Sequence, residues 1–459
     1  MVIGQTGERV DLVVIGGGPG GYSAAIRAAQ LGRTVALVER DAIGGVCLNH
    51  GCIPSKAILS AARLASRAQH AATMGIDATV AVDLSRLQAW KRGVVDKLAT
   101  GVRGLLDRWG VRTIRGTGRF SGERRVAVDT GEDVIFVEFG AAVLATGSRP
   151  VTTGGLTPEQ ALDLEELPPR LTVIGGSYIA AELATAFARL GSAVTLLCPE
   201  ERLLPELDEP LLSRAVAGGL QRLGGEVIRS VTIEGIEDGM VAYRTDGGST
   251  SVGADLVIDA ARRVPNTADL GLEHAGVRLL GDGTIAVDAQ CRTSAHHIFA
   301  AGDITPGPAL AHRAIAQGRV AAEAAGGLPS ALDATVLPLA FFTEPEVAAA
   351  GLSERAARGQ GYDVIAARFP FGASGRALTL EEPDGLVQVV AERAGGRLLG
   401  VQIAGPVATE LIGEAALAIE MTATLEDLAL TLHPHPSLAE SFVEAADLAL
   451  GRPRHLFKR

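Results

Sequence analysis

A segment of thirty residues occurs twice in this chain, and this repeat constrains the fold more than any other feature. One copy, DLVVIGGGPGGYSAAIRAAQLGRTVALVER, begins at Asp11, and the other, RLTVIGGSYIAAELATAFARLGSAVTLLCP, begins at Arg170. An offset of 159 positions aligns the two copies without a gap. Each copy contains an apolar strand, a glycine turn, an alanine-rich helix and a second apolar strand, which is the βαβ unit that binds a dinucleotide. The repeat therefore predicts two dinucleotide-binding domains of Rossmann type.

The first copy has every sequence feature of a dinucleotide site. Gly16, Gly18 and Gly21 fill the GxGxxG positions, which permit a tight turn, the approach of the backbone to a pyrophosphate, and close packing of helix on strand. Glu39 ends the second strand, 23 residues after Gly16, where a carboxylate can accept hydrogen bonds from both ribose hydroxyls. Two such units in one chain predict two dinucleotides, and a flavin paired with a nicotinamide is the usual couple.

The second copy departs from this pattern. Gly175 keeps the first glycine, but Ser177 replaces the second and Ala180 replaces the third, where alanine is an accepted variant. The offset also carries Glu39 onto Cys198, and a thiol accepts hydrogen bonds only weakly. We therefore expect the second site to hold its nucleotide more loosely than the first.

Length and composition set further limits. The chain has 459 residues, whereas single hydrophobic cores stop growing near roughly 250–300 residues, so we expect about three domains. A formal charge of −11 and an aromatic content of 4% argue against a nucleic-acid partner, which needs basic and stacking side chains. The sequence shows no charged leader with a long apolar run and no stretch that reaches the roughly 18 apolar residues of a membrane span. We therefore expect a cytoplasmic protein with no membrane partner.

Two of the four cysteines are closely spaced, in the run GGVCLNHGCIPSKAILSAARLA. Cys47 and Cys52 fall just before, or on, the first turns of an expected helix, whose N-terminal amides stabilise a thiolate. Lys56 lies one turn beyond Cys52 and adds a nearby cation. We expect this pair to carry out thiol–disulfide exchange, and we expect no metal, because zinc would need further ligands that no second cysteine pair or HxxxH motif supplies.

Another group of titratable residues stands near the C-terminus, in the run LHPHPSLAESF. A histidine can carry a proton to or from a thiol near neutral pH, and a carboxylate bonded to its second nitrogen would fix its tautomer. His435 and Glu440 form such a dyad if the chain bends between them, and Pro436 could supply the bend. Taken alone, His433 and His435 would be better explained as two surface histidines.

With these residues in place, the whole chain resembles the pyridine nucleotide-disulfide oxidoreductases, and within them the branch that oxidises dihydrolipoyl groups. The marks of the family are GGVCLNHGCIPSK, ATGS at 145–148, AGDITPGPALAHRA at 301–314, FFTEPEVAAAGLSE at 341–354 and HPHPSLAE at 433–440. The cysteine and histidine motifs together are highly specific. The stretch between Trp90 and Gly110 and the run FPFGASGRALTLE are most similar to the forms that serve branched-chain 2-oxo acid dehydrogenase complexes.

The resemblance implies an α/β protein with two Rossmann-like dinucleotide-binding domains, one for FAD and one for NAD, and a C-terminal α+β dimerisation domain. The FAD-binding domain would comprise residues 1–149 and 265–332. The NAD-binding domain would be inserted between these pieces at 150–264, and residues 333–459 would form the dimerisation domain. The protein would act as a homodimer.

The resemblance also implies a reaction and the residues that perform it. Cys52 would lie next to the flavin, and Cys47 would exchange with the substrate. His435 and Glu440 would reach the active site of the other subunit, so a monomer would be inactive. The reaction implied is the oxidation of a dihydrolipoyl group, carried by the lipoyl domain of a 2-oxo acid dehydrogenase complex, with reduction of NAD⁺.

Cofactor contacts follow from the same resemblance and from the two βαβ units. Lys56 and Glu182 would pair near the flavin, and Asp303 would bind its ribityl-phosphate side. The full set of residues expected around the two cofactors is Gly16, Gly18, Gly21, Glu39, Lys56, Thr146, Gly147, Gly175, Glu182, Cys198, Gly302 and Asp303.

Two other interpretations remain open at this point. Glutathione-type reductases share both motifs but usually carry basic residues after the second strand for the 2′-phosphate of NADPH, whereas Glu200 and Glu201 occupy this stretch here. The altered second site, with Arg262 where the family has glycine in the run RRVPN, could instead mark a flavin-bearing subunit that has lost nicotinamide turnover. We favour the NAD-dependent enzyme, because acids repel a 2′-phosphate and because the cysteine and histidine motifs are intact.

Overall fold

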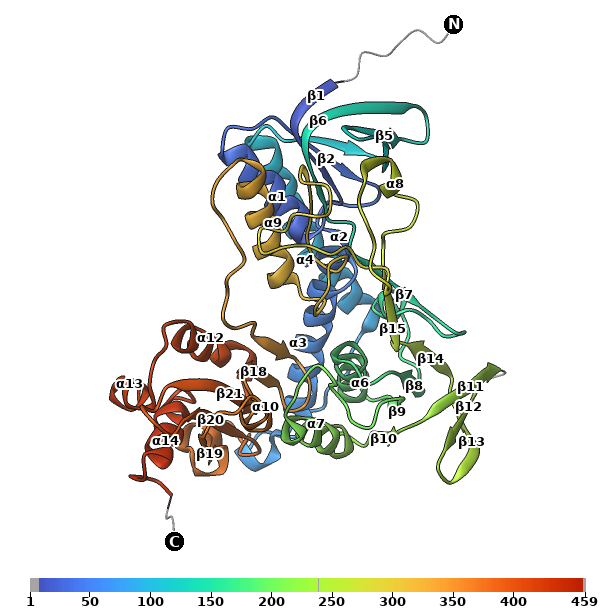
Figure 1. Cartoon of the computed structure of the whole chain (residues 1–459). Helices are drawn as coiled ribbons and strands as arrows, with labels where there is room; N and C mark the ends of the chain where they lie inside the picture. Colours follow the sequence, from blue (N-terminus) through green and yellow to red (C-terminus); the bar gives the residue numbers. More distant parts are fainter. Residues whose placement is uncertain (1–7, 238, 457–459) are drawn as a thin grey trace, which may run out of the picture.

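The computed structural model describes residues 8–237 and 239–456. Residues 1–7 and 457–459, which belong to the expected FAD-binding and dimerisation domains, lie outside the described residues. The expectation that the N-terminus contains no charged leader therefore falls partly on residues that the structure does not describe. Two open sheets of the dinucleotide-binding type and one antiparallel sheet organise the chain (Figure 1). The predicted fold class, two Rossmann-like domains with a C-terminal α+β domain, is confirmed.

The first sheet is built from two separated stretches of the chain. Its strands run in the order β3-β2-β1-β6-β5-β4, and β16, from much later in the sequence, also pairs with β6. They are β1 (Glu8–Ile15), β2 (Val35–Glu39), β3 (Arg112–Arg115), β4 (Thr117–Gly122), β5 (Arg125–Asp129), β6 (Val134–Leu144) and β16 (Ile298–Ala300). Where β1, β2 and β6 pair in parallel, residues 12–15, 35–38 and 142–144 are apolar and buried, as strands covered on both faces must be.

Helices cover this sheet and extend below it. Helices α1 and α9 pack side by side, and α3 descends toward the rest of the molecule (Figure 1). The helices of this part are α1 (Pro19–Gln30), α2 (Gly45–Asn49), α3 (Cys52–Gln69), α4 (Leu84–Arg108), α8 (Leu272–Ala275) and α9 (Ala311–Ala325), with a short 3₁₀ turn at Ala71–Met74. Small residues of α1, among them Ala24 and Ala28, are fully buried, which permits the close approach of α9.

The second domain repeats the first unit in space. In the first copy Leu12 pairs with Val35, and in the second Leu171 pairs with Val194, so the strand register is the same at the offset of 159. Its parallel sheet has the order β10-β9-β8-β14 and carries an antiparallel three-stranded sheet beside it. The elements are β8 (Arg170–Ile174), α6 (Tyr178–Leu190), β9 (Ala193–Cys198), α7 (Pro210–Arg222), β10 (Glu226–Arg229), β11 (Thr232–Glu237), β12 (Met240–Thr245), β13 (Gly248–Gly253) and β14 (Leu256–Asp259).

Two antiparallel strands connect the first and second domains. The chain passes into the second domain through β7 (Ser148–Val151), followed by α5 (Pro158–Ala161), and returns through β15 (Arg262–Pro265). Arg262 pairs with Val151 and Pro265 with Ser148. Because entry and return lie side by side, the second domain can be inserted without separating β16 from the first sheet.

The third domain is an antiparallel sheet with helices packed against it, at the lower left of Figure 1. Its strand order is β17-β18-β21-β20-β19. The strands are β17 (Leu339–Phe341), β18 (Val347–Gly351), β19 (Val364–Pro370), β20 (Leu386–Glu392) and β21 (Leu398–Ala404). The helices are α10 (Glu354–Gly359), α11 (Gly375–Thr379), α12 (Ala408–Glu420), α13 (Leu425–Leu430) and α14 (Glu440–Ala449), with a 3₁₀ turn at Phe371–Ala373.

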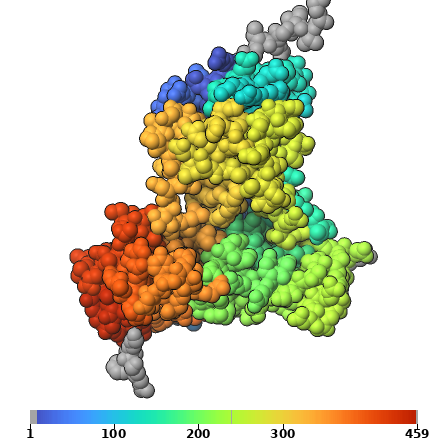
Figure 2. Space-filling model, viewed as in Figure 1, coloured from blue at the N-terminus to red at the C-terminus, as the bar shows by residue number. Residues whose placement is uncertain are grey.

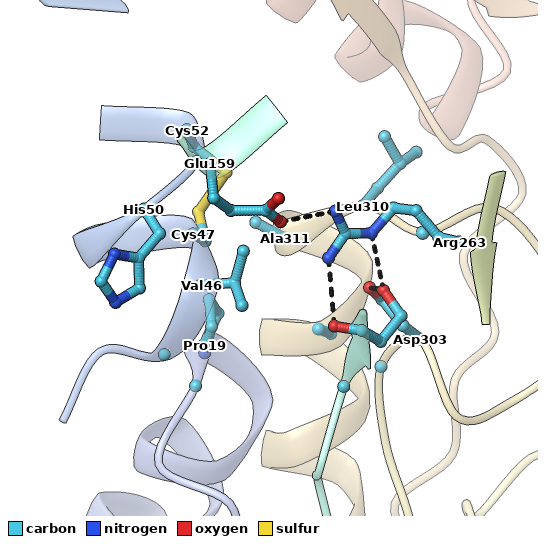
Figure 3. Close-up of a pocket in the computed structure, with 18 of the residues that line it drawn as sticks. Pro19, Val46, Cys47, His50, Cys52, Glu159, Arg263, Asp303, Leu310 and Ala311 are labelled. Atoms are coloured by element: carbon cyan, nitrogen blue, oxygen red, sulfur yellow. Dashed lines mark hydrogen bonds and ion pairs between the residues drawn. A yellow bond between two sulfur atoms is a disulfide. The ribbon is translucent and has the colours of Figure 1, made fainter. Parts of the chain in front are cut away.

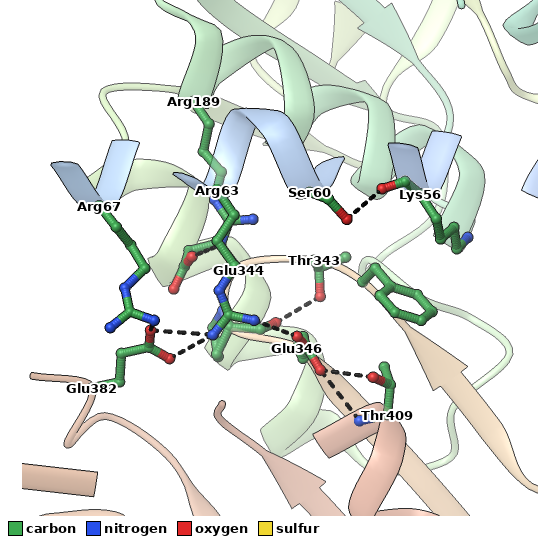
Figure 4. A network of polar contacts seen from close by, with 12 residues as sticks. Lys56, Ser60, Arg63, Arg67, Arg189, Thr343, Glu344, Glu346, Glu382 and Thr409 are labelled. Carbon is green, nitrogen blue, oxygen red and sulfur yellow. Dashed lines mark hydrogen bonds and ion pairs between the residues drawn. The ribbon is translucent and has the colours of Figure 1, made fainter. Parts of the chain in front are cut away.

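A polar network fastens α3 to the third domain (Figure 4). Arg63 of α3 donates to Glu346 at 2.7 Å and to Glu382 at 2.8 Å. Arg189, in the last turn of α6, pairs with Glu344 of the same region. Because Arg63 is partly buried and bound to two carboxylates, it holds α3 more firmly than an isolated surface ion pair would. The middle of α3 is therefore tied directly to the third domain, which in turn is tied to α6 of the second domain.

The space-filling view shows the second and third domains as two lobes below the first (Figure 2). Within residues 8–237 and 239–456, no helix combines the length and the apolar character that crossing a membrane requires.

Candidate active site

A cavity of about 450 Å³ lies where the first sheet, the start of α3 and the start of α6 meet (Figure 3). This volume falls within the range of small-molecule and cofactor sites. Most of the residues predicted from the sequence line it, namely Gly16, Gly18, Glu39, Cys47, Cys52, Lys56, Thr146, Gly147, Glu182, Gly302 and Asp303. The predicted residues that do not line it are Gly21, Gly175, Cys198, His435 and Glu440.

The first glycine turn packs directly against α1. Gly16 has φ +103°, in the left-handed region that favours glycine, and a methyl group on Gly21 would overlap the carbonyl oxygen of Gly16. The carboxylate of Glu39 is fixed beside this turn, because Oε2 accepts from the amide of Gly17 at 2.6 Å and Oε1 accepts from the amide of Asp41 at 2.9 Å. The turn and an oriented carboxylate therefore stand together at the edge of the cavity.

The two predicted redox cysteines form a disulfide. Cys47 lies in the short helix α2, and Cys52 is the first residue of α3, with 4.6 Å between their Cα atoms. Both line the cavity, and Figure 3 shows the sulfur bond facing it. The amides of the first turn of α3, an 18-residue helix, provide the positive end of a helix dipole at Cys52, which stabilises a thiolate once the disulfide is reduced.

An ion pair between a partly exposed lysine and a buried carboxylate supports this end of α3. Nζ of Lys56 donates to Glu182 of α6 at 2.7 Å, so the pairing expected from the resemblance is present. Glu182 is 3% exposed, and its other oxygen accepts from the amide of Phe342 at 3.0 Å. Lys56 also lies 4.9 Å from the ring centroid of Phe342. A buried carboxylate with both oxygens bonded is compensated, so the cation stays fixed one turn from Cys52.

A second polar group lies on the opposite side of the cavity (Figure 3). Asp303 accepts from the hydroxyl of Ser148 at 2.6 Å. Arg263 donates to the same hydroxyl at 3.0 Å and to Glu159 at 2.8 Å. The run RRVPN contains two arginines: Arg262, which departs from the family pattern, is exposed, and its neighbour Arg263 lines the cavity. Strand alternation places the two adjacent arginines on opposite faces of β15, but it does not say which face is turned to the cavity.

The histidine dyad lies in the third domain. The chain bends at His435 and Pro436, and Nδ1 of His435 lies 2.9 Å from Oε1 of Glu440. Oε2 of Glu440 accepts from the amide of Ser437 at 2.8 Å. Burial acts to raise the pKa of Glu440, but the Ser437 amide and His435 outweigh it and hold this pKa below its ordinary value. The side chain of His435 is 84% exposed, whereas that of His433 is 6% exposed.

The second glycine turn corrects the expectation for Cys198. This residue is completely buried, and its thiol donates to the carbonyl oxygen of Glu200 at 3.3 Å. Burial, together with the charge of Glu200, raises the pKa of Cys198 to about 12, so the side chain is a neutral thiol facing the core. A methyl group on Gly176 would overlap the carboxylate of Glu200. The acid beside this turn thus comes from two residues beyond the position that the gap-free alignment indicated.

Comparison with known proteins gives one class. Residues 10–318 match the pyridine nucleotide-disulphide oxidoreductase family, and residues 337–446 match the dimerisation domain of that family. The chain therefore belongs to the pyridine nucleotide-disulphide oxidoreductases, enzymes that use FAD and a nicotinamide nucleotide. Its relatives include the dihydrolipoyl dehydrogenases of Geobacillus stearothermophilus and Halobacterium salinarum, each 44% identical, and that of Bacillus subtilis, 42% identical, all over the full length of both chains.

Solved structures agree with this assignment. LpdA from Mycobacterium tuberculosis superposes with a TM-score of 0.88 at 28% identity, covering 96% of this chain and 99% of that one. The HOCl-induced flavoprotein disulfide reductase from Escherichia coli gives a TM-score of 0.85 at 26% identity, covering 95% and 99%.

The residues around the cavity fit a bound FAD. A single cavity is lined by the glycine turn at Gly16, by the carboxylate of Glu39 and by the disulfide, so an extended dinucleotide could contact backbone amides and the sulfurs at once. In the described part of the chain, no group of three or more histidine, cysteine, aspartate or glutamate side chains is arranged to hold a metal ion.

Proposed function

We propose that this protein oxidises dihydrolipoyl groups to lipoyl groups and reduces NAD⁺, using FAD and the Cys47–Cys52 disulfide. The observation that carries the proposal is the disulfide itself, which lines the same cavity as the first glycine turn and begins a helix that favours a thiolate. The dihydrolipoyl substrate is supported by the names of the relatives that are 42–44% identical over the full length of the chain.

The cysteines would perform the exchange in two steps. One thiolate of the substrate attacks the sulfur of Cys47, which forms a mixed disulfide and releases Cys52 as a thiolate beside the amides of α3. The second substrate thiol then attacks its own partner sulfur, which closes the lipoyl ring and releases Cys47. Two electrons and two protons thus leave the substrate. FAD, when bound, supplies the two-electron carrier between the reduced cysteine pair and NAD⁺.

His435 would act as the base that accepts the proton of the substrate thiol. Glu440 would orient it through the 2.9 Å contact to Nδ1, which leaves Nε2 to face the substrate. His435 is largely exposed and is not among the residues that line the cavity of its own chain. We infer that the dyad serves the cavity of a second copy in a homodimer, which the match to a dimerisation domain supports.

The physiological partner would be the lipoyl domain of a 2-oxo acid dehydrogenase complex, and the site of action the cytoplasm. The test is a steady-state assay of the FAD-loaded protein with free dihydrolipoamide and, in parallel, NAD⁺ and NADP⁺. The expected result is rapid turnover with dihydrolipoamide and NAD⁺. Preferential reduction of glutathione disulfide by NADPH would instead favour a glutathione-type reductase.

A second assay separates the enzyme from a flavin-bearing subunit without nicotinamide turnover. NADH is mixed anaerobically with the FAD-loaded protein, and the flavin absorbance is followed. In an active enzyme the flavin absorbance should fall, because NADH reduces the flavin. If the flavin keeps its absorbance in the presence of NADH, the proposed activity is overturned, whatever the result of the dihydrolipoamide assay.

A further inference from the structure

The loop between β9 and α7, residues 199–209, folds back onto the glycine turn of the second βαβ unit. The amide of Leu204 donates to the carbonyl oxygen of Gly176 at 2.7 Å, which fixes the loop against the turn. Two partly buried acids of this loop, Glu200 and Glu206, are thereby brought to the turn. Neither belongs to the strand end where the sequence pattern places a ribose-binding acid.

Glu200 stands in the second unit where Glu39 stands in the first. A methyl group on Gly17 would lie 3.2 Å from Oε2 of Glu39. A methyl group on Gly176, which the offset pairs with Gly17, would overlap Oε2 of Glu200. The thiol of Cys198 also stands against Gly176, but it is fully buried and lies 3.5 Å from the same carboxylate oxygen, to which it can donate a hydrogen bond.

We propose that Glu200, in place of Cys198, holds the adenosine ribose of NAD(H) and discriminates against NADP(H). A carboxylate at this position accepts hydrogen bonds from both ribose hydroxyls and repels a 2′-phosphate. One cation also lies close by: Arg229 ends β10 as the register partner of Cys198 and is exposed. Both nucleotides must therefore be compared. The inference rests on nicotinamide use by the family and not on the dihydrolipoyl substrate.

The experiment measures reduction of the flavin by NADH and by NADPH in the FAD-loaded protein, so that it needs no disulfide substrate. Glu200→Gln keeps the shape and an acceptor for the Cys198 thiol but removes the charge. The half-saturating NADH concentration should rise about tenfold or more, the effect of losing hydrogen bonds to a charged group, while the limiting rate stays unchanged. The preference for NADH over NADPH should fall by at least as much.

Three further variants sharpen this test. Glu226→Gln removes an equal charge from the first residue of β10, at the other end of this strand from Arg229, and is the matched control that should leave both constants unchanged. Cys198→Glu should not lower the half-saturating NADH concentration, because the new carboxylate would be buried beside Glu200 and could not reach the ribose. Three results would each overturn the proposal. They are tighter NADH binding by Cys198→Glu, normal NADH binding by Glu200→Gln, and weaker NADH binding that is seen only with Glu201→Gln.

Glu206 carries a separate inference from a different contact. Its Oε1 accepts from the amide of Tyr178, the first residue of α6, at 3.4 Å. Its Oε2 is buried and has no hydrogen-bond partner among the described residues, and the same holds for the hydroxyl of Ser177. Burial, and then the charge of Glu200, raise the pKa of Glu206. Because this carboxylate makes only one long hydrogen bond to a backbone amide, an anion that binds the helix start more strongly can displace it.

We infer that Glu206 occupies the place at the start of α6 that the pyrophosphate of the nicotinamide nucleotide takes, and that it weakens nucleotide binding by competing for it. The start of a helix binds phosphate through free backbone amides, and Glu206 engages one of these amides. In the first unit the corresponding helix begins with Pro19, and among the described residues no side-chain hydrogen bond caps its start. The second site would therefore be weakened by an acid of its own loop.

The test is Glu206→Gln in the same flavin-reduction assay, with Glu226→Gln as control. Removing a like charge from the phosphate position should lower the half-saturating NADH concentration at least about tenfold, with the limiting rate unchanged. The gain should be equal for NADPH, because both nucleotides carry the pyrophosphate. A variant that binds NADH more weakly would show that Glu206 supports the site and would overturn this inference.

Discussion

Around the first glycine turn, the carboxylate of Glu39 is held by two backbone amides at the end of β2. Around the second turn, the acids Glu200 and Glu206 arrive from the following loop, and one oxygen of Glu206 has no partner in the part of the chain that the structure describes. Both units share one strand register. A repeated backbone therefore preserves the place for a nucleotide, while the side chains that contact it can be replaced from a neighbouring loop.

The two turns also differ at the second position of the glycine motif, which is Gly18 in the first unit and Ser177 in the second. The backbone conformation is nevertheless almost the same. Gly18 has φ −70° and ψ −175°, and Ser177 has φ −68° and ψ 168°. Both are extended conformations that any residue can adopt. The backbone therefore needs glycine at neither position, and serine at the second turn leaves the helix start unchanged.

The largest effect should come from exchanging the third position of the motif between the units. Gly21→Ala should yield little FAD-loaded protein, because its methyl group would overlap the carbonyl oxygen of Gly16, and overpacking of this kind costs roughly 1–3 kcal/mol. Ala180→Gly should retain FAD and lose only about 1 kcal/mol of stability, the usual cost of glycine in a helix. FAD content and the thermal unfolding temperature measure the effect of each variant. Equal losses of FAD and of stability in Gly21→Ala and Ala180→Gly would show that the two units are packed alike.

The next effect should separate the redox pair from the nucleotide sites. Cys47→Ser and Cys52→Ser should each slow dihydrolipoamide oxidation by at least about 10³-fold, as losing a catalytic nucleophile does, while FAD stays bound. Visible spectra should then differ: Cys47→Ser keeps the Cys52 thiolate and should show a long-wavelength charge-transfer band, which Cys52→Ser should lack. Identical spectra would contradict the roles assigned to the two sulfurs.

A smaller loss is expected at the dyad of the third domain. His435→Gln should slow dihydrolipoamide oxidation by about 10²–10⁴-fold, since that is the contribution of a positioned base. Flavin reduction by NADH should be unaffected, because hydride transfer does not use this base. His433→Gln is the matched control: this histidine is buried against Glu414, so its loss should lower stability more than activity. Damage confined to His433→Gln would show that the dyad is misplaced.

The smallest effect should be at Ser177. Its buried hydroxyl can donate a hydrogen bond to a phosphate, so Ser177→Gly should weaken NADH binding by about two- to tenfold, the range for one neutral hydrogen bond. The half-saturating NADH concentration in the flavin-reduction assay measures this. Tighter binding by Ser177→Gly would mean that the hydroxyl keeps the pyrophosphate away from the turn.

Much of the site could be predicted because it is encoded locally. The spacing of Cys47 and Cys52 ahead of an alanine-rich helix predicted their place at the start of α3, and the predicted contact between His435 and Glu440 spans a single bend. Arg263 was missed because only the pairing of β15 with β7 determines which of two adjacent arginines faces the cavity.

The sequence by itself determined that two βαβ units exist and how their strands are aligned, because glycine spacing and apolar periodicity act within thirty residues. Only the tertiary structure decided which acid stands beside the second turn. The end of β9 is buried, so Cys198 turns into the core, and the loop that follows must fold back to bond its amide at Leu204 to Gly176. That return brings Glu200 and Glu206 to the turn, a result of long-range packing that no alignment of the two copies contains.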